Sequence, residues 1–342
     1  MTQSQSTKVV THLGLVILSL AALITGVTGA SLANASELKV GGFVDAQYQT
    51  RPFAPALLNE RNSFIINDGN FTFEKEQGNA NFFLAIPFRG GFNGAATTSG
   101  TVIVPGTSNF TVGANTAQAY VGYKYNDKLS WKLGQFESLY GFESNETSDI
   151  AFTTQGLLKT NFTPSTHDGL AATFNMNKDA GVTAMIANHH DQGTVGGLRP
   201  DFGVKVFNSP NWYRASFGVL IEDKAATTNA EKAIYDLMLG KTMGVMSVDA
   251  ELMIKSLGSS NGWAGLLNDS CAFTDKVNGV VRFEYENKME SVYKNQFELG
   301  VGPTYALSKE LITKADFYLL SQNNYVTTGT QKNFAVSAVY KF

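Results

Sequence analysis

The sequence contains a single cysteine, Cys271, so no disulfide can form within the chain. It has only 8 prolines among 342 residues, and its 26 basic side chains nearly balance its 29 acidic ones. Because no basic stripe is present, nucleic acid is not an expected partner. Glycine (33), tyrosine (13) and phenylalanine (24) are abundant instead, which suits closely spaced strands with aromatic residues at their ends.

Long hydrophobic runs are missing after position 35, where none approaches the roughly 20 residues that a transmembrane helix needs. The apolar run at 13–24 follows Lys8 and precedes a small-residue site at 33–35. This order is typical of a secretory signal peptide, and a short membrane anchor is the alternative. We expect residues 1–35 to be cleaved and residues 36–342 to be exported through the periplasm. Since Lys8 is the only charge lost, the net charge changes from −3 to −4.

Segments of alternating apolar and polar residues recur through the exported chain. In one of them, Phe283 and Tyr285 share a face, and Glu284 and Glu286 share the opposite face. A strand of about 11 residues, tilted near 45°, spans roughly the 25 Å apolar band of an outer membrane. The segments are 39–49, 62–75, 79–90, 112–125, 128–138, 167–177, 181–190, 199–208, 211–222, 231–242, 244–256, 262–273, 276–287, 294–307, 310–321 and 331–342. These sixteen segments predict an all-β fold, a transmembrane antiparallel up-and-down β-barrel over residues 36–342.

The connections between these segments alternate between short and long. The short ones carry turn residues, at 77–78, 126–127, 177–179, 209–210, 242–243, 274–275 and 308–309. The longer ones are 50–61, 91–111, 139–166, 191–198, 223–230, 257–261, 288–293 and 322–330. This rhythm predicts short periplasmic turns and long external loops. A soluble β-sandwich would also show many short strands, but it would not explain this rhythm together with the leader.

The C-terminal segment ends on alternating aromatic residues. Phe334, Tyr340 and Phe342 share one parity, which we expect to face lipid, whereas Ser337 and Lys341 would face the lumen. The segment should pair with the strand that begins near position 39, because closing the sheet removes its edges. Tyr340 and Phe342 are therefore predicted to close the barrel and to be recognised by the barrel-insertion machinery.

Charges of both signs fall on the parity that would face the lumen, which predicts a wet interior. Sixteen strands leave room for an aqueous path, although cross-barrel ion pairs that stiffen the wall are the alternative. The predicted lumen-facing residues are Asp45, Asp249, Glu251, Glu284, Glu286, Lys314 and Asp316.

The longest connection, 139–166, is predicted to fold inward and narrow the pore, as a long third loop can do in a wide barrel. Its acids Glu143, Glu146 and Asp149 would then face basic wall residues across a constriction with a strong field. The predicted basic residues are Lys132, Lys205, Arg214 and Arg282. An external lid is the alternative, since long loops usually lie at the surface.

No constellation for catalysis, metal or cofactor binding is expected. His189 and His190 are adjacent in a strand-like segment, so their rings would point to opposite faces, and a third ligand is missing. His167 precedes Asp168, but no nucleophile motif accompanies the pair. We therefore expect a protein that is not an enzyme.

Short motifs in order along the chain resemble those of a known family. They are Val40-Gly41-Gly42-Phe43-Val44-Asp45-Ala46, Trp131-Lys132-Leu133-Gly134-Gln135-Phe136, Tyr140-Gly141-Phe142-Glu143, the set Pro164, His167, Gly169 and Leu170, and Arg282-Phe283-Glu284-Tyr285. The exported chain resembles the outer-membrane porins called β-barrel porin type 2. The resemblance implies a passive diffusion pore without catalytic residues. The apolar first loop, 53–58, departs from the family and is a candidate either to contact a neighbouring subunit or to cover the mouth of the barrel.

The sequence thus predicts a bacterial outer-membrane porin through which small hydrophilic solutes or ions diffuse. Its expected partners are outer-membrane lipid, these solutes, the insertion machinery and, as an open possibility, two further copies in a homotrimer. A structural or adhesive barrel with a plugged lumen and partner-binding loops is the main alternative. An outer-membrane hydrolase lacks a nucleophile, and an energised importer would need a plug domain before the first strand.

Overall fold

The computed structural model describes residues 37–50, 62–92, 108–112, 117–188, 200–222, 232–257, 260–287, 293–324 and 328–342. The first strands are β1 (Lys39–Thr50), β2 (Asn62–Gln77), β3 (Ala80–Phe92), β4 (Ser108–Val112), β5 (Gln118–Lys124), β6 (Leu129–Glu137), β7 (Thr166–Asn175) and β8 (Ala180–Ala187). The remaining strands are β9 (Asp201–Asn208), β10 (Tyr213–Glu222), β11 (Lys232–Met243), β12 (Met246–Leu257), β13 (Ser260–Ala272), β14 (Val277–Asn287), β15 (Tyr293–Ala306), β16 (Leu311–Asn324) and β17 (Thr328–Lys341).

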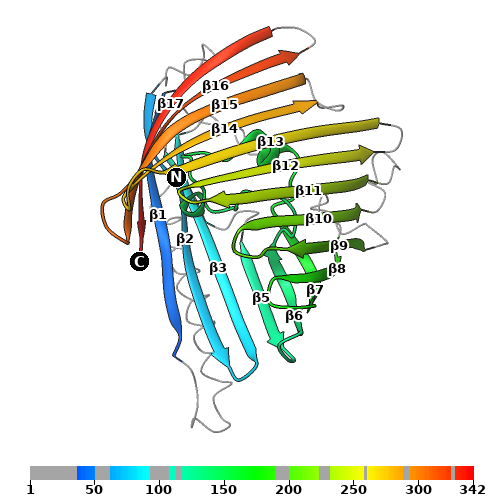
Figure 1. The fold of residues 1–342 in the computed structure, drawn as a ribbon. Helices are drawn as coiled ribbons and strands as arrows, with labels where there is room; N and C mark the ends of the chain where they lie inside the picture. The colour runs from blue at the N-terminus through cyan, green and yellow to red at the C-terminus, as the bar shows by residue number, and fades with distance from the viewer. Residues whose placement is uncertain are drawn as a thin grey trace, which may run out of the picture.

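These strands form one closed antiparallel sheet (Figure 1), in which β1 pairs with both β2 and β17. The single strand predicted at 112–125 is instead two pieces, β4 and β5. Both pair with β3, β4 beside its Phe88 end and β5 beside its Ala80 end, so together they fill one position in the wall. With β4 and β5 counted as one, the described strands make the sixteen-strand barrel that the sequence predicts.

The two faces of the wall have opposite character. On β14, Arg282 and Glu284 lie inside and are each 1% exposed, whereas Val281 and Phe283 lie outside and are 46% and 45% exposed. Because successive side chains of a strand point to opposite faces, this alternation gives β14 a polar inner face and an apolar outer face. Among the described residues, no helix has the length and apolar character to cross a membrane.

The short turns lie at one end of the barrel, which is the periplasmic end in outer-membrane barrels. Asn126 and Asn177 each accept two backbone N–H bonds within their turns. Two predicted turn positions were wrong by one or two residues. The turns fall at 78–79 and 244–245, because Gly78 (φ +59°) and Gly244 (φ +62°) adopt the left-handed conformation that tight hairpins need.

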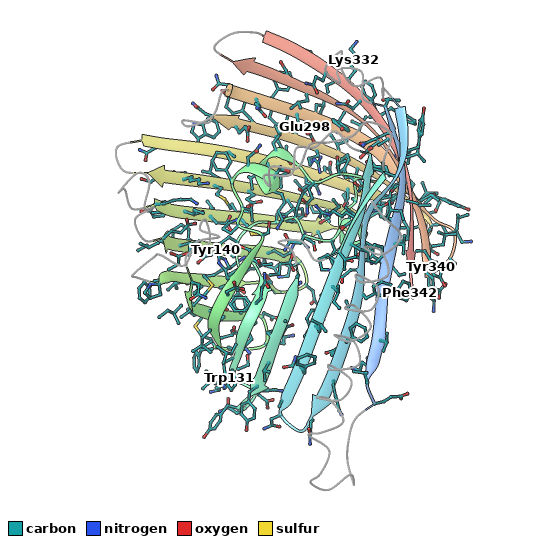
Figure 2. The ribbon with its side chains drawn as sticks, turned by 180° about the vertical axis from the view of Figure 1, so that it is seen from behind. Trp131, Tyr140, Glu298, Lys332, Tyr340 and Phe342 are labelled. Atoms are coloured by element: carbon teal, nitrogen blue, oxygen red, sulfur yellow. The ribbon has the colours of Figure 1, made fainter. Side chains whose placement is uncertain are left out.

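The barrel closes where the sequence predicts, between its first and last strands. Phe43 pairs with Lys341 and Gln49 with Ala335, and Gly42 and Phe342 exchange two backbone hydrogen bonds of 3.0 and 3.1 Å. Tyr340 and Phe342 lie on the outer surface (Figure 2), about half exposed. No free edge remains at this seam for pairing with another chain.

The register of the seam can be tested by cross-linking. Ala46 and Ala338 are directly paired, and paired Cα atoms about 4.5–5.5 Å apart fit disulfide geometry. In a Cys271→Ser background, Ala46→Cys with Ala338→Cys should form a disulfide on mild oxidation, measured by mobility in unheated gels. Ala46→Cys with Phe334→Cys is the control, because four residues of strand separate position 334 from the paired position by about 13 Å. Equal cross-linking of the two pairs would contradict the register.

Candidate functional site

The connection between β6 and β7, residues 138–165, lies inside the ring of strands (Figure 2). It contains a single turn of 3₁₀ helix, η3 (Thr147–Asp149), and the short helix α2 (Leu157–Asn161). It hydrogen-bonds to inward side chains on β1, β2, β9, β11, β12, β14, β16 and β17. We call this segment the inner loop. Its position agrees with the inward fold expected for 139–166 and not with an external lid.

The start of the inner loop is held by two acids on neighbouring strands. Asp236 on β11 accepts the backbone N–H of Gly141 (3.1 Å), and Glu251 on β12 accepts that of Phe142 (3.0 Å). Both carboxyls are buried. Backbone N–H groups are obligatory donors, so these wall acids supply the acceptors that a crossing loop would otherwise lack.

Tyr140 fixes the height at which the loop crosses the lumen. Its side chain lies over Gly203 and Gly218 on β9 and β10, where added Cβ atoms would come within 2.3 Å of its hydroxyl oxygen and 2.7 Å of its ring, respectively. Its hydroxyl donates to the carbonyl oxygen of Val219 at 2.9 Å. The two glycines therefore form the seat of this ring.

An apolar cluster continues this seat across the extracellular half of the inner wall. Its members are Phe136, Tyr140, Leu158, Phe162, Ala171, Met185, Ala187, Leu220, Ile234, Met253, Ala264 and Leu266. Leu158 and Phe162 come from the inner loop, and β10 to β13 supply wall residues of inward parity such as Leu220 and Met253. Burying this apolar surface is favourable at about 25 cal/mol per Å², so the loop is held by packing as well as by polar contacts.

Arg282 on β14 is the cation at the centre of the polar contacts. Its guanidinium contacts Glu143 of the inner loop (Nη1 to Oε1, 2.7 Å) and Glu298 of β15, and its Nε lies 3.4 Å from Glu284. The ring of Phe152, also from the loop, lies 4.4 Å from the guanidinium carbon. The side chain of Arg282 is 1% exposed. Arg282 therefore ties the loop to the wall at a site from which water is largely excluded.

The middle of the inner loop is bound by a lysine and an acid on β16. Lys314 donates to the carbonyl oxygens of Thr147 and Ile150, the latter at 2.6 Å. Asp316 accepts the backbone N–H and the hydroxyl of Thr153, both at 2.8 Å. The wall thus supplies both a donor and an acceptor to the loop backbone.

Helix α2 is fastened to β14 by two further acids. Glu284 accepts the backbone N–H of Leu158 (2.7 Å), and Glu286 accepts the side-chain amide of Asn161 (2.9 Å). Gly156 precedes the helix, and a Cβ there would lie 1.7 Å from the Glu284 carboxylate. Glycine at this position is what allows the close approach.

The three acids predicted to line the constriction have different partners in the structure. Glu143 is buried against Arg282, as described above. Glu146 accepts an amide N–H from Asn70 at 2.6 Å, and its burial raises the pKa of its carboxyl. Asp149 pairs with Lys341 on β17 at 2.9 Å.

Of the four basic residues predicted to face these acids, only Arg282 forms an ion pair with one of them. Lys205 donates to the loop carbonyl of Leu139 instead (2.6 Å). Arg214 pairs with Asp249 of the wall (Nε to Oδ1, 3.1 Å), and no described carboxylate forms an ion pair with Lys132. Parity fixes the face of a side chain but not its height in the barrel, so the expected opposition of Lys132, Lys205 and Arg214 to the loop acids stays a prediction.

The seven predicted lumen-facing residues lie on the inner face. Six of them, Asp45, Glu251, Glu284, Glu286, Lys314 and Asp316, point toward the inner loop or its contacts. Asp249 lies nearer the short-turn end, beside Arg214. The wall and loop charges are thus largely engaged with each other.

His167 is the one histidine in the described part of the chain. His167 is buried on the inner face, with Nε2 3.4 Å from the hydroxyl of Ser138, whereas Asp168 follows it on the opposite face. His189, His190 and the first loop lie outside the described residues. No set of three potential metal ligands occurs in the described ranges.

Sequence reasoning missed several groups that position the loop. Asn70, Glu298 and Lys341 lie on the predicted lumen parity, but nothing in their spacing links them to the loop. Apolar residues of inward parity, such as Leu220 and Ile234, were the available signal for the inner cluster. A run of apolar residues on both faces of adjacent strands indicates that something other than water covers the inner one.

The model of one protein family, described as "Putative beta-barrel porin-2, OmpL-like", matches residues 37–342. The chain belongs to this family. With a closed sixteen-strand barrel, it is therefore a passive diffusion channel of the bacterial outer membrane. No curated protein sequence matches it.

Solved porins share the fold of this β-barrel porin-2 chain. The outer-membrane channel DcaP of Acinetobacter baumannii matches with a TM-score of 0.65 and 13% identity over 91% of this chain and 99% of that one. OmpF of Salmonella typhi matches with a TM-score of 0.65 and 10% identity, over 90% of this chain and 100% of that one. OmpT of Vibrio cholerae, in a trimer form, matches with a TM-score of 0.61 and 10% identity, over 90% of this chain and 100% of that one.

Replacing Arg282 tests the polar centre of the site. Arg282→Gln leaves Glu143, Glu284 and Glu298 buried without their cation, so the free energy of unfolding should fall by about 3–5 kcal/mol. Urea titration of the folded band in unheated gels measures the change. Arg214→Gln is the matched control, since Arg214 is 45% exposed beside Asp249 and such pairs contribute about 0–1 kcal/mol. Equal small losses in both variants would contradict the assignment.

Replacing one glycine of the Tyr140 seat tests the packing. The Cβ of Gly218→Ala would lie 2.7 Å from the ring of Tyr140, so overpacking should cost about 1–3 kcal/mol and displace the loop. In Gly265→Ala, the control, the new Cβ meets its nearest atom at 3.8 Å. Urea titration and proteolysis within 138–165 report the two effects. If Gly218→Ala changes neither the stability of the barrel nor the proteolysis of the loop, the packing of Tyr140 against Gly218 is looser than described.

Proposed function

We propose that the inner loop narrows the lumen and sets the size limit for small hydrophilic solutes and ions that diffuse through the barrel. The observation that carries this is the set of bonds from one loop to strands around the barrel, from Asn70 on β2 to Arg282 on β14. A segment attached at so many points stays in the path of the solute. No catalytic step is part of this proposal.

The residues proposed to act at the constriction fall into two groups. Glu143 and Arg282 fix the loop to the wall, and Lys205 donates to the carbonyl oxygen of Leu139 near its start. We propose that the other four predicted residues act on passing ions, Asp149 and Arg214 from exposed positions and Glu146 and Lys132 from partly buried ones.

Export and assembly complete the proposal. Residues 1–35 act as a cleaved signal peptide, and the outward Tyr340 and Phe342 form the signal for the insertion machinery. A homotrimer is the proposed assembly, supported by the trimer form of the structurally similar OmpT. Lipid contacts the remaining apolar outer surface.

Planar-bilayer recording tests the channel and its narrowing together. The refolded protein should give discrete ohmic steps in KCl, and a variant with 145–160 replaced by a short Gly-Ser linker should give larger ones, because the loop no longer occupies the cross-section. Unheated gels confirm that each barrel is folded. A folded but silent wild-type protein favours the plugged, adhesive alternative, and equal step sizes contradict narrowing by the loop.

A further inference from the structure

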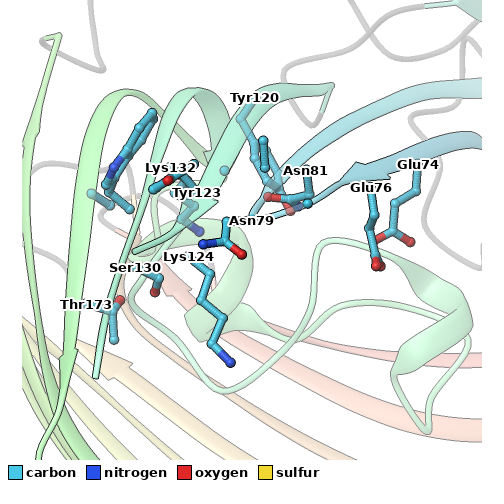
Figure 3. A pocket seen from close by; sticks show the side chains of 15 residues that line it. Glu74, Glu76, Asn79, Asn81, Tyr120, Tyr123, Lys124, Ser130, Lys132 and Thr173 are labelled. Atoms are coloured by element: carbon cyan, nitrogen blue, oxygen red, sulfur yellow. The ribbon is translucent and has the colours of Figure 1, made fainter. Parts of the chain in front are cut away.

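A cavity of about 480 Å³ lies at the short-turn end of the lumen, on the wall formed by β2, β3, β5, β6 and β7. Its polar lining includes Asn81, Lys124, Ser130, Lys132 and Thr173. Figure 3 shows these side chains gathered on one side of the cavity, with Glu74 and Glu76 together on the other. The two sides therefore differ in charge.

Lys132 carries the charge that its surroundings do not neutralise. It points inward from β6, with its ammonium 4.4 Å from the ring centroid of Phe136 and 5.7 Å from that of Tyr120. Within the described ranges it makes no ion pair, and Glu137 is the carboxylate whose charge acts on it. That carboxylate already accepts the backbone N–H of Asn145 at 2.8 Å.

The other lysines in and beside the cavity are paired, and Glu74 and Glu76 share one of them. Lys124 contacts Asp127 at 2.7 Å, and Lys39 contacts Glu76 at 3.1 Å and Glu74 at 4.0 Å. Lys132 is thus the lysine of the cavity without a carboxylate partner among the described residues. A partly buried ammonium without a counter-ion attracts an anion more strongly than one in bulk water does.

The groups around Lys132 suit a small organic anion. Its ammonium is a charge-assisted donor for a carboxylate, and Ser130, Thr173 and Asn81 supply neutral donors on the same wall. The ring of Tyr120 also lines the cavity, where it is stacked on Phe83 with the ring centroids 5.2 Å apart, and it adds apolar surface beside the Lys132 ammonium. Gly122 leaves the space that the Asn81 side chain occupies on this wall.

We propose that this cavity is a binding site for small organic carboxylates, with Lys132 as the group that binds the carboxylate. The inference deepens the proposed diffusion function, on which it rests, by naming a class of solute. A site within the path makes passage of such anions saturable, because the site is occupied at high concentration.

Calorimetry on the folded protein in detergent tests the site without conduction. Benzoate should bind the wild-type protein, and benzamide, which has the same ring without the charge, should not. Lys132→Gln should weaken benzoate binding about ten- to a hundredfold, the worth of a charge-assisted contact, and Lys132→Arg should retain it. Lys124→Gln is the matched control, since Lys124 lies in the same cavity but is paired, and should change binding less than about twofold.

Absence of benzoate binding, or equal binding to wild type and Lys132→Gln, overturns the site. Equal binding of benzamide overturns the role of the charge. Single-channel recording in KCl separates these results from failure of the channel itself. A protein that conducts KCl but binds no benzoate keeps its proposed function and loses this site.

Discussion

The guanidinium of Arg282 is the centre of the charged contacts that join the inner loop to the wall. It projects from β14 and is surrounded by carboxylates of the loop (Glu143) and the wall (Glu284, Glu298). Placing one cation and three acids away from water is costly unless each finds its partners, so loop and wall constrain each other. The position of the loop, and with it the width of the lumen, depends on this cluster.

The outer and inner surfaces of the barrel face different surroundings. Lipid covers an apolar outer surface, and the backbone is satisfied by a sheet without edges. Inside, the wall divides by height. Its extracellular half carries the apolar cluster on which α2 packs, and its short-turn half carries charged residues around open volume. The inner loop packs against the extracellular half of the wall and leaves open volume in the short-turn half, so it narrows the pore without filling its whole length.

Much of the fold followed from the period of two in the sequence. Parity placed Glu284 and Asp316 inside and Phe283 and Tyr340 outside, and the turn chemistry located most hairpins. The inward loop was also expected from its length. The partners of the loop charges could not be predicted in the same way. Contacts such as that of Glu146 with Asn70 join residues whose relative height depends on strand tilt and on the path of the loop. The apolar seat of Tyr140 was missed because glycines in strands usually indicate bulges or close approaches without naming the partner.

The central claim is that the inner loop stays in the lumen while the channel conducts. Thr153 and Asp316 are in contact across the loop and β16, so Thr153→Cys and Asp316→Cys in a Cys271→Ser background can be joined by a short bifunctional thiol reagent. Single-channel conductance is then compared before and after the reaction. The account predicts the same open conductance in both states. If cross-linking abolishes or sharply reduces the open conductance, the loop leaves the lumen during conduction and the account is contradicted.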